Sequence, residues 1–168
     1  MKKIEYKPRN KEYFSKLLSF SKELFKIFNK LKIKPIVYGS VSYAFYTKDQ
    51  NIEIHDIDLL VPESSFVKII GEIKEDKKLC YEETNYHSLK IFKDDAKITC
   101  DSIEKYYKNL PHDFVEIKIN NVPFTILSLK ALTKIYKRGK AKASFKRESY
   151  SNKLEKLYLV KRQFLRYQ

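Results

Sequence analysis

The 168-residue chain has no tryptophan, one methionine, two cysteines and three glycines. So few glycines exclude a flexible, low-complexity chain. Cys80 and Cys100 stand apart and match no metal-finger or redox spacing, so we expect reduced thiols in or near the core. No apolar run approaches the roughly 20 residues of a membrane span, and the charged N-terminus lacks the apolar segment of a signal peptide. These absences predict a cytoplasmic protein without a membrane partner.

The positive charge of the chain is large and unevenly distributed. The formal net charge is +14, and the length is enough for one domain to bury a core. Residues 1–48 hold 12 Lys/Arg against 3 Asp/Glu, residues 49–116 hold 9 against 16, and residues 117–168 hold 14 against 2. An acidic middle between basic ends suits a site that holds cations centrally and a polyanion around them. A proteome-wide bias toward lysine is an alternative source of many lysines, but it does not gather the acids in one segment.

Apolar periodicity predicts helices and strands in alternation. Helices are expected at 10–32, 41–48, 63–76, 128–140 and 151–165, and strands at 35–40, 53–62, 87–93, 96–101, 114–119 and 122–127. The pairs Asp94-Asp95 and Asn120-Asn121 join the last four strands into two hairpins. Within the helix at 63–76, the residues expected to face inward are Phe66, Val67, Ile70 and Ile73.

This order of elements predicts an α/β (α+β) fold, in which a mixed β-sheet is flanked by helices. We expect a single domain over 1–168, made of a catalytic core at 10–126 and a basic helical tail at 127–168.

Two aspartates one residue apart, Asp56 and Asp58, interrupt an otherwise apolar strand. Alternate residues of a strand share a face, so both carboxylates point together while Ile57, Leu59 and Val61 face the core. Two adjacent carboxylates repel each other, and burial of either one raises its pKa or costs stability. A Mg²⁺ ion removes both problems, since it binds one or two carboxylates together with substrate phosphates. The alternative is a pair of solvated residues at an exposed strand edge.

A second feature, Gly39-Ser40, lies upstream where an apolar strand ends and a helix begins. A helix N-terminus has free backbone N–H groups and binds anions such as phosphates. Gly39 would let the backbone approach closely, and Ser40 would be both the N-cap and a hydrogen-bond donor to phosphate. An ordinary N-cap is the alternative. Together with the aspartates, this pair predicts a site in which Mg²⁺ holds a nucleoside triphosphate.

The stretches "VYGS" and, about a dozen residues later, "HDIDLLV" resemble the signature of the nucleotidyltransferase superfamily with the DNA polymerase β type of catalytic fold. The chain is similar to small stand-alone domains of this superfamily, and "ILSLKALTKIYKRGKAKA" extends the resemblance over roughly residues 10–145. Members include antibiotic adenylyltransferases, RNA-end modifying enzymes and toxins of toxin–antitoxin pairs. The resemblance implies transfer of a nucleoside monophosphate from an NTP to a hydroxyl, with release of pyrophosphate.

Such chemistry uses a third acidic ligand, because two metal ions stabilise the attacking and leaving oxygens. Ile98 and Cys100 fit the core face of their strand, which leaves Asp101 on the other face as the candidate. The alternative is that Asp101 caps a helix beginning near Ser102. If Thr99 instead holds the family's acidic position, the third ligand is missing.

The basic tail offers cations for phosphates. Eight basic residues and no acid lie between 127 and 147, and the resemblance makes Lys137 the candidate nucleotide-binding lysine. The others could contact an RNA backbone or simply form a solvated helix face. Tyr106 and Tyr107 could stack on a base or serve packing. The remaining candidates, the histidines His55, His87 and His112, are expected to be mainly structural, although His55 could contact a phosphate or base.

The sequence therefore predicts a nucleotidyltransferase that depends on Mg²⁺ (or Mn²⁺), with an NTP, foremost ATP, as substrate. The acceptor would be RNA, such as tRNA, or a small molecule, and an antitoxin-type protein is a further candidate partner. One rival is a non-catalytic nucleotide- or RNA-binding module with a degenerate site. A second rival is a structural basic protein with a chance motif.

Overall fold

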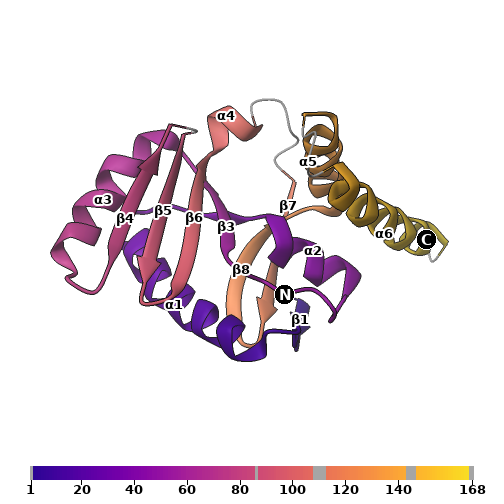
Figure 1. Ribbon diagram of the computed structural model, residues 1–168, viewed down its shortest axis with the longest axis horizontal. Helices are drawn as coiled ribbons and strands as arrows, with labels where there is room; N and C mark the ends of the chain where they lie inside the picture. Colours follow the sequence, from indigo (N-terminus) through magenta and orange to yellow (C-terminus); the bar gives the residue numbers. More distant parts are fainter. Residues whose placement is uncertain (1, 86, 108–112, 143–146, 167–168) are drawn as a thin grey trace.

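The computed structural model shows an eight-stranded β-sheet with helices packed on its faces (Figure 1). The structure describes residues 2–85, 87–107, 113–142 and 147–166. The strands are β1 (Lys2–Ile4), β2 (Ile36–Val37), β3 (Ile57–Val61), β4 (Cys80–Thr84), β5 (Ser88–Lys93), β6 (Ala96–Ser102), β7 (Phe114–Ile119) and β8 (Val122–Leu127). Across the sheet their order is β1-β7-β8-β2-β3-β6-β5-β4.

The helices fall close to the expected positions. They are α1 (Lys11–Lys30), α2 (Gly39–Thr47), α3 (Phe66–Glu75), α4 (Ile103–Tyr107), α5 (Leu129–Lys142) and α6 (Arg147–Arg166), with a 3-10 turn at Glu63–Ser65. In the described part of the chain, no helix combines the length and the apolar character that crossing a membrane requires.

The sheet is mixed, as predicted. β3 lies parallel to β6 and antiparallel to β2, while β2 lies parallel to β8. The two predicted hairpins, β5–β6 and β7–β8, are also confirmed. Asn120 and Asn121 both have positive φ, 46° and 66°, which is the geometry of a two-residue hairpin turn. The predicted α/β (α+β) class with a mixed sheet and flanking helices is therefore correct.

The two faces of β3 enter different hydrophobic clusters. Ile57, Leu59 and Val61 belong to the larger cluster, which contains the buried apolar stripe of α1. Leu60 points the other way and joins a smaller cluster built by α2, α5 and α6, in which Leu132 is fully buried. The alternation of side chains along β3 therefore holds helices against both sides of the strand that carries Asp58.

Several local predictions were wrong or incomplete. The short edge strands β1 and β4 were not predicted, since short or exposed segments show little periodicity. The short helix α4 begins next to Ser102, where the alternative for Asp101 had placed a helix. Cys100 is a buried free thiol as expected, but Cys80 is exposed on the edge strand β4. Val67 was expected to face inward and is instead 79% exposed, whereas Ile69 is fully buried.

Because Ile69 is buried and Val67 is exposed, truncating them should lower the stability of the protein by very different amounts. Ile69→Ala should lower the free energy of unfolding by about 2–5 kcal/mol, because it leaves a cavity beneath α3. Val67→Ala should change it by less than about 0.5 kcal/mol, because the side chain touches mainly solvent. Urea denaturation of both variants measures the difference, and similar midpoints would contradict this orientation of α3.

Candidate active site

Gly39 lies where β2 ends and α2 begins, against the carboxylate of Asp58. Its φ is +63°, a left-handed conformation that glycine adopts without strain. A Cβ atom at this position would overlap with Asp58 Oδ2. Two independent constraints therefore favour glycine at position 39: the backbone conformation and the lack of space for a side chain.

Ser40 occupies the first turn of α2 and was expected to be its N-cap. That prediction was wrong, since the N-cap is Tyr38 and no side chain caps this helix. The first backbone N–H groups of α2 consequently have no side-chain acceptor from the N-cap. An anion placed at this end of the helix would meet them directly.

Asp56 and Asp58 lie next to each other at the start of β3. Asp56 directly precedes the strand, and its Oδ2 is 2.9 Å from the Lys97 ammonium on β6. Burial raises the pKa of Asp58 to about 8, and the charges of Asp56 and Asp101 act in the same direction. The hydrogen bond to Asp56 raises the pKa of Lys97, so this ammonium stays charged beside the aspartate pair.

Both predicted features border one cavity of about 430 Å³, whose walls include Gly39, Ser40, Asp56 and Asp58. Tyr38 lies beside them, and α5 and α6 supply the remaining wall. The residues from these two helices are Ile135, Tyr136, Ser149, Tyr150 and Lys153. The expected phosphate cradle and the expected metal ligands thus border the same open cavity.

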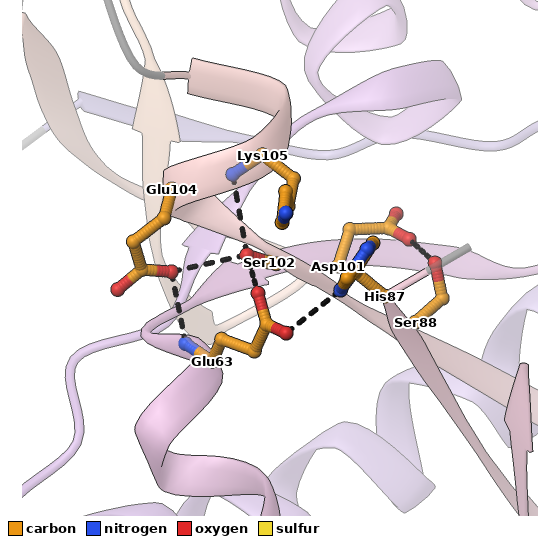
Figure 2. A network of polar contacts seen from close by, with 7 residues as sticks. All are labelled: Glu63, His87, Ser88, Asp101, Ser102, Glu104 and Lys105. Carbon is orange, nitrogen blue, oxygen red and sulfur yellow. Dashed lines mark hydrogen bonds and ion pairs between the residues drawn. The ribbon is translucent and has the colours of Figure 1, made fainter. Parts of the chain in front are cut away.

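Asp101 lies beside this group but does not line the cavity. It is 6% exposed and accepts hydrogen bonds from the hydroxyls of Ser88 and Tyr38 (Figure 2 shows the first of these). Burial raises its pKa, while the two hydrogen bonds oppose the shift. The parallel register sets Thr99 beside Asp58 and places Asp101 beside Leu60.

The alternative role for Asp101, a cap for the following helix, is wrong. The Ser102 hydroxyl accepts a hydrogen bond of 3.2 Å from the Lys105 N–H, so Ser102 caps α4 (Figure 2). The Ser102 hydroxyl also lies 2.7 Å from Glu63, which in turn is 2.7 Å from Nδ1 of His87. This network ties the end of β6 to the turn after β3 and supports the structural role predicted for His87.

A different lysine from the predicted one lies at the cavity. Lys137 does not line the cavity, and its ammonium lies 5.5 Å from the ring centroid of Tyr158. Lys153 of α6 lines it instead, with its ammonium 5.5 Å from the ring centroid of Tyr136. Its positive charge also acts to lower the pKa of Asp58. Sequence reasoning missed Lys153 because nothing in the spacing of α6 shows which lysine faces α2.

The other candidates lie at the margins. His55 is exposed, and its Nε2 lies 3.4 Å from the Glu53 carboxylate. Tyr106 is 41% exposed and close enough for its phenol to raise the pKa of Tyr38. His112 and the side chain of Tyr107 lie outside the described residues.

The donor set fits one hard cation shared with a substrate better than a closed metal centre. Over the described ranges, no group of three or more His, Cys, Asp or Glu is arranged to hold a metal ion. Two adjacent carboxylates such as Asp56 and Asp58, one of them with a raised pKa, are the protein ligands that Mg²⁺ takes when phosphates and water complete its shell.

The chain matches no protein-family model and no curated protein at the level of sequence. Solved structures do resemble it. The antibiotic-resistance factor ANT(2'')-Ia, in complex with adenylyl-2''-tobramycin, is 13% identical with a TM-score of 0.59, over 90% of this chain and 98% of its own. Lincomycin-bound lincosamide antibiotic adenylyltransferase LnuA is 14% identical with a TM-score of 0.57, over 92% and 99%. A putative nucleotidyltransferase from Thermotoga maritima is 21% identical with a TM-score of 0.51, over 80% and 93%.

These similarities identify the fold as that of the nucleotidyltransferases, as the two sequence motifs predicted. They extend over nearly the whole length of the two antibiotic adenylyltransferases. At 13–21% identity they concern the fold, and the chemistry depends on the residues of the site.

The environment of Asp58 predicts that an amide there stabilises the metal-free protein. The pKa of Asp58 in the folded state lies above the usual 3.8, so its charged form costs stability, increasingly as the pH rises toward 8. Asp58→Asn should therefore raise the free energy of unfolding by more than the roughly 1.4 kcal/mol that one pKa unit represents, at pH 8 and in EDTA. The gain should be smaller at pH 5.

Asp49→Asn is the matched control. Its carboxylate lies 2.5 Å from the Lys156 ammonium, and that hydrogen bond lowers the pKa of Asp49. This variant should lose stability at both pH values. Thermal unfolding of the two variants and the wild type gives the comparison, and a loss of stability for Asp58→Asn at pH 8 would contradict the prediction.

Proposed function

We propose that this protein transfers a nucleoside monophosphate from an NTP, foremost ATP, to a hydroxyl group, with Mg²⁺ or Mn²⁺ as the cofactor. The observation that carries the proposal is the shared cavity of Gly39, Ser40, Asp56 and Asp58. A helix N-terminus that attracts phosphates stands in it opposite two carboxylates that attract a cation. The nucleotidyltransferase fold agrees with this chemistry. We assign the reaction to the cytoplasm, where NTPs are available.

The triphosphate would bind at the start of α2. Backbone N–H groups and the Ser40 hydroxyl would donate hydrogen bonds there. The space that Gly39 leaves is filled by the Asp58 carboxylate, so a cation held by Asp58 would lie next to the phosphates. Lys153 is better placed than Lys137 to neutralise the departing pyrophosphate, because Lys153 lines the cavity.

Asp56 and Asp58 would hold the metal ion. When bound, the ion would withdraw charge from the transferred phosphoryl group and lower the pKa of the acceptor hydroxyl. Asp56 orients the Lys97 ammonium at 2.9 Å, which adds a second positive charge on the same side of the sheet. The side chains thus bind and position the triphosphate, while the acceptor approaches from the open side.

We favour an anionic acceptor such as RNA over a cationic antibiotic. Lys90 and Lys97 lie on the same sheet face as Asp58, because Lys90 pairs with Thr99 and Thr99 with Asp58. Each of the two already has a carboxylate partner, Glu82 and Asp56, so the excess charge comes from the rest of the chain. The chain as a whole carries a net charge of +14. A net positive charge of this size attracts a phosphate backbone and repels a polycation.

The direct test is calorimetric titration of Mg·ATP into the wild type and into Asp56→Asn/Asp58→Asn. We expect the double variant to bind at least about tenfold more weakly, since both metal ligands are lost. Asp49→Asn, which lies outside the cavity, should bind as the wild type does. Equal binding in the wild type and the double variant would remove the aspartates from the site and leave a chance motif on a basic protein.

Turnover is tested with labelled NTPs incubated with RNA and with small-molecule fractions. Label should appear in RNA, in a metal-dependent manner that raised salt suppresses. Label that appears only in small molecules would contradict the preference for RNA while leaving nucleotidyl transfer in place.

One observation favours the rival, a non-catalytic nucleotide- or RNA-binding module. Thr99, which is not acidic, lies in register with Asp58, whereas Asp101 is held by Tyr38 and Ser88. We keep Asp101 as the proposed third ligand because its charge acts on Asp58. The rival predicts binding of Mg·ATP without transfer.

Two substitutions separate these possibilities. If Asp101 is the third ligand, Asp101→Asn should reduce transfer by about 100-fold or more while Mg·ATP binding changes little, because the loss concerns the transition state. If the site is degenerate, the wild type shows no transfer and Thr99→Asp introduces it. Full transfer by Asp101→Asn would exclude the catalytic role of this carboxylate.

A further inference from the structure

Helix α6 forms one wall of the cavity, although the sequence presented it as part of a basic tail. Ser149, Tyr150 and Lys153 line the cavity, and their spacing places them on one face of a helix. In Figure 1, α6 follows α5 and the two helices lie side by side, in agreement with their contacts and with those of α6 to α2. A segment late in the sequence therefore completes a site that begins at Gly39.

The ring of Tyr150 rests directly on the backbone of α5 at Gly139. A Cβ atom at Gly139 would lie 2.9 Å from Cζ of Tyr150 and 3.0 and 3.1 Å from the two Cε atoms. Glycine is a poor residue inside a helix, and its φ here is not in the left-handed region. Space for the Tyr150 ring is thus what this glycine provides.

A second aromatic ring lies next to Tyr150. The ring centroids of Tyr150 and Tyr136 are 5.8 Å apart with an interplanar angle of 51°. Tyr136 is buried and meets the ring of Tyr43 edge-on, at 6.2 Å and 84°. Tyr150 is the partly exposed end of this series, and it lines the cavity as Tyr136 does. Its position is therefore set by packing on Gly139 and Tyr136.

The cavity has two chemically different sides. The start of α2 and the aspartate pair suit a triphosphate with its cation. The wall from α5 and α6 contains the apolar and aromatic residues Ile135, Tyr136 and Tyr150, next to Ser149 and Lys153. An NTP has the same two parts, a charged triphosphate and a flat base. Aromatic side chains bind bases by stacking, with little preference among the four bases.

We infer that Tyr150, seated on Gly139, is the residue on which the base of the bound nucleotide stacks. This inference rests on the proposed function, because it needs the triphosphate at the start of α2. Tyr150 is then a binding residue for the nucleoside, and Gly139 is a positioning residue that acts through it.

The test compares two probes, Mg·ATP and magnesium tripolyphosphate, which lacks the base. Calorimetry with Tyr150→Leu should show an ATP affinity reduced about tenfold or more, whereas Tyr150→Phe keeps it and tripolyphosphate binds all three proteins equally. Unchanged ATP binding in Tyr150→Leu, or an equal loss for both probes, overturns the inference. If the wild type binds neither probe, the proposed function fails as well; if it binds both equally, the inference alone fails.

Gly139→Ala tests whether Gly139 positions the Tyr150 ring, and Gly139 is not itself one of the residues that line the cavity. The added methyl group must displace the Tyr150 ring, so ATP affinity should fall at least about threefold while tripolyphosphate affinity stays unchanged. Gly71→Ala on α3 is the matched control, because a Cβ there meets no atom within 4 Å. Equal ATP affinity in the two variants overturns the positioning role of Gly139.

The absence of tryptophan allows a direct optical measurement. Tyr150→Trp places one fluorophore at the proposed stacking position, and Tyr158→Trp places one on the same helix at a residue that is 36% exposed and outside the cavity. ATP should quench the first and not the second, and tripolyphosphate should quench neither. Quenching by tripolyphosphate as strong as that by ATP overturns the stacking assignment.

Discussion

The contact between the Gly39 backbone and the Asp58 carboxylate is the constraint on which the rest of the site depends. It exists because β2 and β3 are antiparallel neighbours and the Tyr38 N–H donates a 3.0 Å hydrogen bond to the Asp58 carbonyl. That pairing places the first turn of α2 directly beside the side chain that would bind a cation. A glycine with φ of +63° lets the chain enter the helix without moving the carboxylate away.

Around this contact, the protein holds carboxylates close together with different compensating groups. Asp56 has the Lys97 ammonium, and Asp101 has the hydroxyls of Tyr38 and Ser88. Asp58 has burial and like charges, which raise its pKa, and Lys97 and Lys153 oppose this only partly. Repulsion between these carboxylates in the absence of a cation would favour cation binding, because the ion relieves the repulsion as it binds. The network from Glu63 to Ser102 keeps the end of β6, and with it Asp101, in place.

The fold adds the third side of the site through helices that arrive late in the chain. The resemblance to structures such as ANT(2'')-Ia and LnuA covers about nine-tenths of this chain at 13–14% identity. Here it is Tyr150 on Gly139, Tyr136 and Lys153 that give the cavity an aromatic side and a positive charge.

The sequence by itself determined the helices and strands with strong periodicity, both hairpins, and the pairing of Gly39 and Ser40 with Asp56 and Asp58. The elements and hairpins follow from short-range rules, since strand alternation and turn residues act over a few positions. The pairing of the two motifs came from the resemblance that they carry. The sequence placed Val67 and Cys80 in or near the core, although both are exposed, and it could not select Lys153 over Lys137. Spacing along a helix shows which residues share a face, but the neighbouring elements decide which face is buried. Whether Asp101 or Thr99 lies beside Asp58 depended on the register of β3 against β6, a pairing between residues some 40 positions apart. Tertiary structure alone decided these points, because only packing of distant segments brings α6 to α2 and Tyr150 to Gly139.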